Sequence, residues 1–99
     1  MIFGKCLRSL SIGILPISIA GYNVFYSRPS TAGDVTVTFS GMTNGQVLFV
    51  INESQNNGLL TVTNTQAGDT SILANTSRMY IYIDNTDLGY GTKWCGSRS

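Results

Sequence analysis

Short runs of apolar and β-branched residues alternate with turn residues from position 22 onward. In residues 34–39, DVTVTF, valine or phenylalanine alternates with threonine after the first residue. A period of two predicts a strand with one buried face and one polar face. Residues 46–51, QVLFVI, are almost wholly apolar and lie between turn signals. This second pattern predicts a central strand that is buried on both faces.

Two later runs continue the pattern. The Asn-Asn-Gly turn at residues 56–58 precedes the run LLTVT at residues 59–63. It predicts an antiparallel hairpin, because these residues supply the left-handed backbone conformations of a tight turn. Residues 78–84, RMYIYID, alternate aliphatic residues with Tyr80 and Tyr82. We expect the aliphatic set to face the core and the tyrosines to face outward or toward a partner.

The spacing of these runs predicts the fold class. About six to eight short strands recur at intervals of roughly 8 to 12 residues, and no stretch of helical periodicity is long enough for a helix. We therefore predict an all-β fold, a single antiparallel β-sandwich or jelly-roll-like domain over residues 22–99. The chain shows no internal repeat of fixed period.

Residues 1–21 differ in character and have two interpretations. In the first they form an extended hydrophobic N-terminal arm that lies across a neighbouring subunit. β-Branched residues around a central proline suit an edge strand or an arm of this kind. The isoleucines are Ile12 and Ile14 on one face of the strand, and Ile17 and Ile19 on the other. We expect deletion of the arm to weaken assembly and to leave the β-rich body folded.

In the second interpretation the same residues are a secretory signal peptide. Lys5 and Arg8 precede an apolar run, and the small residues Ser18 and Ala20 suit cleavage after Ala20. The apolar run covers residues 10–19, whereas a helix needs about 20 residues to cross the hydrocarbon layer of a bilayer. We therefore expect no membrane anchor.

Composition bounds the function further. The chain has 99 residues, of which 42% are hydrophobic and only 11% are charged, against roughly 25% charged residues in an average soluble domain. One small core and a weakly charged surface favour burial against partner subunits. The net charge of +1 comes with no cluster of basic residues, so we expect no nucleic-acid binding.

The two cysteines, Cys6 and Cys95, lie near opposite ends of the chain. A disulfide between them would close nearly the whole chain and stabilise it by roughly 4 kcal/mol on the loop-entropy model. Two free thiols in a reducing compartment are the alternative. The sequence leaves both possibilities open.

Residue types that carry catalysis are scarce. The chain has no histidine, which removes the most versatile acid and base near neutral pH and the commonest transition-metal ligand. The two lysines, Lys5 and Lys93, lie in no motif that would activate a serine. We therefore predict that the protein is not an enzyme and carries no cofactor and no metal.

Two kinds of polar motif remain, and neither requires a functional explanation. Residues 84–87, Asp-Asn-Thr-Asp, could offer oxygen ligands to calcium but lack the spacing of an EF-hand loop. Aspartate and asparagine are also the usual residues of turns after strands. Residues 52–54 and 75–77 match the N-glycosylation acceptor pattern, which chance explains in a chain rich in asparagine and threonine.

About two thirds of the chain resembles small β-rich modules of bacteriophage virion proteins, which occur among capsid cement or decoration proteins and head or tail fibres. The resembling segments are VTVT at 35–38, GMTNGQVL at 41–48, INES at 51–54, LTVTN at 60–64, MYIYI at 79–83 and GTKW at 91–94. The resemblance implies a homotrimer that binds other virion proteins, such as the major capsid protein, and no catalysis.

The expected function is therefore that of a structural virion subunit that stabilises a particle through subunit contacts. If residues 1–20 are a signal peptide, the alternative is a secreted or surface binding module, such as a pilus subunit or a lectin-like adhesin. Tyrosine and tryptophan provide large contact areas with a polar handle. The predicted interface residues are Ile12, Ile14, Ile17, Ile19, Tyr80, Tyr82, Tyr90 and Trp94.

Overall fold

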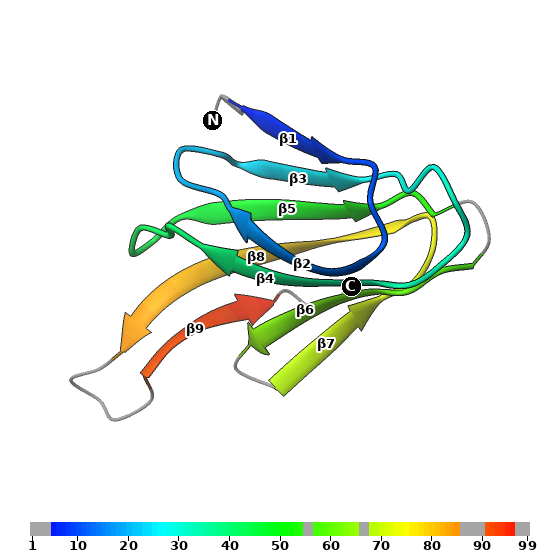
Figure 1. Ribbon diagram of the computed structural model, residues 1–99. Helices are drawn as coiled ribbons and strands as arrows, with labels where there is room; N and C mark the ends of the chain where they lie inside the picture. The colour runs from blue at the N-terminus through cyan, green and yellow to red at the C-terminus, as the bar shows by residue number, and fades with distance from the viewer. Residues whose placement is uncertain (1–4, 55–56, 66–67, 86–90, 97–99) are drawn as a thin grey trace.

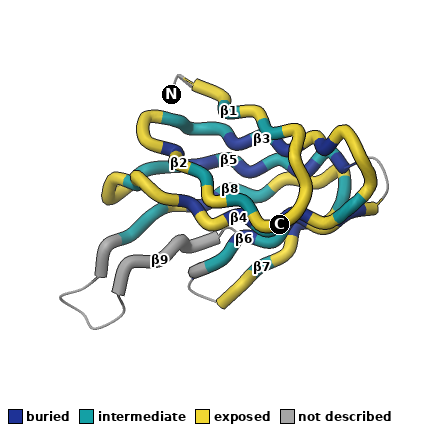
Figure 2. Tube along the Cα trace, viewed as in Figure 1, coloured by how far each residue is buried: buried dark blue, intermediate teal, exposed yellow. Residues whose placement is uncertain are grey.

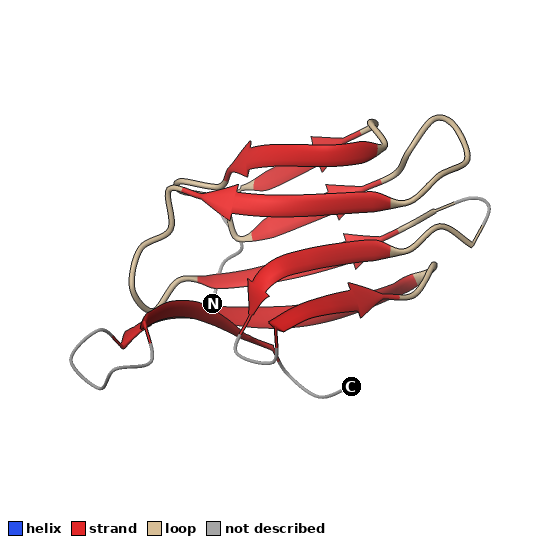
Figure 3. Cartoon of the chain, turned by 60° about the horizontal axis from the view of Figure 1, so that its bottom comes forward, coloured by secondary structure: helices blue, strands red, loops and turns tan. Residues whose placement is uncertain are grey.

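The computed structural model describes residues 5–54, 57–65, 68–85 and 91–96; for residues 64, 84, 85 and 91–96 it describes the backbone alone. Every regular element in this part of the chain is a strand (Figure 3), which confirms the all-β prediction. The strands are β1 (Cys6–Ser9), β2 (Gly13–Ser18), β3 (Val24–Ser27), β4 (Val35–Ser40), β5 (Val47–Asn52), β6 (Leu60–Thr65), β7 (Gly68–Ile72), β8 (Thr76–Asn85) and β9 (Gly91–Gly96).

The strands form two layers of four. One layer has the order β1-β3-β5-β8 and the other has the order β2-β4-β6-β7, while β9 pairs with both β8 and β6 and so joins the layers (Figure 1). Buried side chains from both layers belong to one core. The rings of Phe25 on β3 and Phe39 on β4 make an edge-to-face contact between the layers, with centroids 5.2 Å apart.

The path of the chain corrects the prediction of an antiparallel fold. From β1 to β6 the chain crosses to the other layer after every strand, so each pair of consecutive strands forms one coil. Strands that are neighbours within a layer are a whole coil apart and run in the same direction. The pairs β1–β3, β3–β5, β2–β4 and β4–β6 are therefore parallel.

The direction reverses only at the end of the chain. β7 folds back on β6, and β8 then runs antiparallel to β5 and β9 antiparallel to β8. Both layers are therefore mixed. A short hairpin connection makes antiparallel neighbours, whereas one full coil through the other layer makes parallel ones. The hydrophobic period of a strand does not distinguish the two.

The predicted hairpin at residues 56–58 is wrong for the same reason. Asn57 does have a left-handed φ of 58°, but the segment connects β5 in one layer to β6 in the other. A Cβ atom at Gly58 would overlap the carbonyl oxygen of Gly33. Glycine is needed there because the backbones of two crossings lie against each other.

The strand predictions for β4 and β5 hold on the inner face. Val35, Val37 and Phe39 of β4 are buried, and β5 lies between β3 and β8 with Leu48 and Val50 fully buried. The core contains Ile19, Phe25, Val35, Val37, Phe39, Leu48, Val50, Leu60, Val62, Ile72 and Tyr80. Figure 2 shows buried segments alternating with intermediate ones along β3 and β5, and with intermediate or exposed ones along β4.

The orientation predicted for β8 is wrong. Tyr80 is fully buried, whereas Ile81 is 37% exposed. Tyr80 pairs with Leu48 of β5 and shares its inner face. The tyrosine hydroxyl lies 2.7 Å from Oγ1 of Thr70, so its polar group has a partner inside the protein. A satisfied hydroxyl allows the large ring to fill the core.

Residues 5–20, called the terminal coil below, do not extend away as an arm. β1 pairs with β3 along four residues and β2 pairs with β4 along six. Ile19, which follows β2, is fully buried. These residues continue the two layers because the inner-facing Leu7 and Ile17 lie beside Phe25 and Phe39 in the register.

Candidate assembly interface

The terminal coil is the end of both layers. In the described part of the chain, β1 pairs only with β3 and β2 pairs only with β4, so one edge of each strand carries no neighbouring strand. An edge of this kind presents backbone N–H and C=O groups that can bind another chain. The two edges have different chemistry, which the hydrogen bonds reveal.

The open edge of β1 presents the backbone of Cys6 and Arg8. The carbonyl oxygens of Lys5 and Ser9 accept hydrogen bonds from the N–H groups of Asn23 and Arg28, at 3.1 and 2.9 Å. The backbone N–H and C=O groups of the odd-numbered residues therefore point toward β3. Successive residues of a strand point their backbone groups to opposite sides, so the N–H and C=O groups of the two even-numbered residues point away from the protein.

The open edge of β2 is interrupted by Pro16. The N–H groups of Gly13 and Ile19 donate to the carbonyls of Asp34 and Ser40, at 3.0 and 2.9 Å. The backbone groups of the even-numbered residues, Pro16 among them, therefore face the open edge. Proline has no N–H to donate, and such a position is where a strand tolerates it. Of the two structures that this proline suits, an edge strand and an extended arm, the described residues show the edge strand.

Exposed apolar side chains gather in the same coil. Leu10 is 50% exposed, Ile12 41% and Ile14 81%. Leu7, Leu15 and Ile17 are partly buried and pack against the core. Among the large apolar side chains that the structure describes as exposed, the others are Leu59, Leu73 and Ile81. The terminal coil therefore carries more exposed large apolar side chains than any other segment of the described chain.

The predicted interface residues are only partly brought together. Ile12 and Ile14 lie exposed in the terminal coil, where Ile17 is half-buried. Ile19 and Tyr80 are core residues, and Tyr82 is partly buried against the core. Tyr90 and the side chain of Trp94 lie outside the described residues. The structure thus separates the exposed Ile12 and Ile14 from the buried Tyr80.

A second apolar surface was not predicted. It is the outer face of the β1-β3-β5-β8 layer, where Phe49 pairs with Val24 on one side and Met79 on the other. Val47 lies opposite the exposed Ile81. The sequence feature that could have revealed this surface is the apolar run at residues 46–51. Its outer-facing side chains are only half-buried in the structure.

A polar cluster borders this apolar face. The Tyr26 hydroxyl donates a hydrogen bond to the carboxylate of Glu53, whose Oε1 lies 3.6 Å from Nε of Arg28. The hydrogen bond to Glu53 raises the pKa of Tyr26 above its usual 10.0, with burial adding to the effect and the Arg28 and Arg8 cations opposing it. An apolar centre with a polar rim is the usual composition of an interface.

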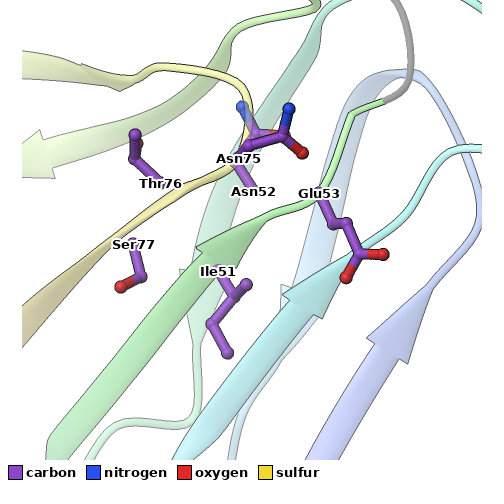
Figure 4. A pocket seen from close by; sticks show the side chains of 6 residues that line it. All are labelled: Ile51, Asn52, Glu53, Asn75, Thr76 and Ser77. Carbon is purple, nitrogen blue, oxygen red and sulfur yellow. The ribbon is translucent and has the colours of Figure 1, made fainter.

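An open hollow of about 380 Å³ adjoins Glu53 and is lined by residues of both N-glycosylation motifs, Asn52 and Glu53 of the first and Asn75, Thr76 and Ser77 of the second (Figure 4). Asn52 is buried and donates to the carbonyls of Gly58 and Ile72, at 3.0 and 2.8 Å, so its amide is not accessible to glycosylation. Asn75 is exposed in the turn before β8. Figure 4 shows Glu53 and Ser77 on opposite sides of the hollow, and the side chains do not converge on one point.

The described residues contain no group of three His, Cys, Asp or Glu side chains that could hold a metal ion. Cys6 is exposed and free. Asp84 and Asn85 of the Asp84–Asp87 motif end β8. Their side chains, and residues 86 and 87, lie outside the described part of the chain.

Comparisons with known proteins found no match among family models, curated proteins or solved structures. In the part of the chain that the structure describes, no helix is long and apolar enough to cross a membrane.

Proposed function

We propose that this protein is a non-enzymatic structural subunit that assembles through its terminal coil. The observation that carries the proposal is the end of the two layers that no other described strand covers, where two open strand edges lie beside Leu10, Ile12 and Ile14. The two layers then act as a sandwich-like module in which the last coil is completed by another molecule.

The energetics favour such a contact. Full burial of one leucine or isoleucine side chain contributes about 1.5–3 kcal/mol. Leu10, Ile12 and Ile14 together therefore supply several kcal/mol toward association, and the cost of ordering two partners must be subtracted. The low content of charged residues, 11%, reduces the desolvation cost of covering the surface.

A virus particle is the proposed setting, with other virion proteins and copies of the chain as partners. The segments that resemble virion modules supply framework strands, with VTVT in β4, LTVTN in β6 and MYIYI in β8. The terminal coil lies outside the resembling segments. In this proposal the framework is shared with such modules, and the coil provides the contact of this particular chain.

Sedimentation of the full-length chain tests the proposal. We expect the wild-type protein to form an oligomer at micromolar concentration. Ile14→Asp should dissociate it, because a charge would be buried in the contact. Leu73→Asp is the matched control, since Leu73 is 64% exposed but lies in the turn between β7 and β8. A monomeric wild-type protein, or equal effects of both substitutions, would overturn the proposal.

A further inference from the structure

We infer that two copies of the chain pair through the open edges of their β1 strands, antiparallel and related by a two-fold axis. The inference rests on the proposed self-assembly at the terminal coil and specifies its geometry. Strand addition at an edge is an established mode of recognition, in which backbone hydrogen bonds provide the affinity.

The direction of the backbone groups selects one register. In an antiparallel pair, two residues that lie opposite each other can exchange both N–H···O=C bonds. Only Cys6 and Arg8 point their backbone groups outward in β1. If Cys6 lies opposite Arg8 of the partner subunit, all of these groups are used and four hydrogen bonds form across the axis.

Competing registers are poorer. With Arg8 opposite Arg8 of the partner subunit, only one such pair forms within β1 and two like charges face each other, which is destabilising. With Cys6 opposite Cys6 of the partner subunit, Arg8 has no opposite residue within β1. The selected register avoids both defects.

The same register also covers the inner face. Leu7 would lie opposite Leu7 of the partner subunit in a non-hydrogen-bonded pair, where side chains approach most closely. Within one subunit, Leu7 pairs with Phe25 and Phe25 with Val50, so the three side chains form a row across the inner face of the layer. The partner's leucine would extend that row, so the contact lengthens the core as well as the sheet.

The β2 edge explains why the backbone pairing between subunits is limited to β1. Pro16 removes the central outward N–H of β2, and a proline at an edge blocks strand addition. A two-fold contact closes on itself and gives a dimer. The resemblance to virion modules implies a trimer instead, so the measured stoichiometry separates the two expectations.

Arg8→Pro tests the pairing. It removes one outward N–H per subunit and no hydrogen bond within the subunit, as Pro16 does in β2. The matched control Arg8→Ala removes the charge but keeps the N–H. We expect Arg8→Pro to weaken dimerisation about tenfold or more, since two hydrogen bonds are lost, and Arg8→Ala to remain dimeric. Sedimentation measures association and circular dichroism confirms the fold.

Cross-linking gives a second measurement if Arg8→Pro does not fold. With Cys6 and Cys95 replaced by serine, Leu7→Cys should form a covalent dimer on oxidation, because opposite residues of a non-hydrogen-bonded pair lie within disulfide range. Arg8→Cys in the same background is the control and should not cross-link. Absence of the Leu7→Cys dimer overturns the pairing.

The outcomes separate the two proposals. If Ile14→Asp dissociates the oligomer while Arg8→Pro leaves its association unchanged, assembly at the terminal coil stands and the β1 pairing fails. A trimeric wild-type protein leads to the same conclusion. If the wild-type protein is a monomer, the assembly proposal itself fails.

Discussion

The hydroxyl of Tyr80 on β8 lies 2.7 Å from Oγ1 of Thr70 on β7. The contact lies at the end of the two layers that is opposite the terminal coil. This contact links the two layers where the chain reverses direction. It allows a tyrosine to occupy a fully buried position. The buried ring, and not the aliphatic residues beside it, therefore forms the inner face of β8.

Loss of this hydrogen bond should cost measurable stability. We expect Tyr80→Phe to lower the free energy of unfolding by about 1 kcal/mol, because the Thr70 hydroxyl loses a partner. Tyr80→Ala should cost about 3–5 kcal/mol through the cavity that it leaves. Urea denaturation measures both. In a double-mutant cycle with Thr70→Val the two losses should not add, and additive losses would contradict the contact.

Asn52 should be intolerant of a charge. Its amide donates to the carbonyls of Gly58 and Ile72 inside the protein. Asn52→Asp places a carboxylate against two acceptors, so we expect a loss of about 3 kcal/mol or more. Asn75→Asp is the control at an exposed position and should change stability by about 0.5 kcal/mol or less. Equal effects in thermal unfolding would show that the buried amide is not critical.

Removal of the terminal coil should unfold the protein. The sequence led us to expect that deletion of residues 1–20 leaves the body folded. In the structure Ile19 is a core residue, and Leu7 and Ile17 lie beside Phe25 and Phe39. We therefore expect the truncated chain to lose cooperative unfolding in circular dichroism. Ile19→Ala alone should cost about 2–5 kcal/mol, and a folded truncated chain would refute this account.

The Tyr26–Glu53 hydrogen bond predicts a pH dependence at alkaline pH. The pKa of Tyr26 is raised because the protonated hydroxyl donates to the carboxylate. The bond therefore stabilises the folded state below the unfolded pKa of about 10, and this contribution is lost as pH rises through the higher folded pKa. NMR titration of the Tyr26 ring should show a midpoint above 10 that falls in Glu53→Gln. An unchanged midpoint in that variant would exclude Glu53 as the cause.

Pro16→Thr should create a second adhesive edge. The substitution restores an outward N–H in β2 at a position whose side chain is exposed. We expect larger oligomers or aggregation by light scattering, because an unprotected edge pairs with other chains. Ser18→Thr is the control, since its N–H already faces outward and is unchanged. Equal behaviour of the two variants would show that proline does not protect this edge.

Several local features could be predicted from the sequence. The alternation in residues 34–39 identified β4 and its inner face, and the apolar run at 46–51 identified a central strand. Pro16 indicated an edge. These predictions succeed because burial of alternate side chains is a property of a few neighbouring residues.

Other features depended on segments that lie far apart. The register joins Cys6 to Val24, an offset of 18 residues, and Val24 to Phe49, an offset of 25. Such unequal coils leave no fixed period for a sequence to reveal. The same turn residues at 56–58 could serve a hairpin or a crossing between layers, and the crossing was found.

The sequence by itself determined that the chain forms short strands, where most of them lie and that little charge would cover them. Only the tertiary structure decided that the coils run parallel, that Tyr80 faces inward and that residues 5–20 form the end of both layers. The physical reason is that the period of two marks which side chains can share a face, whereas strand direction and partners depend on where each connection crosses between the layers.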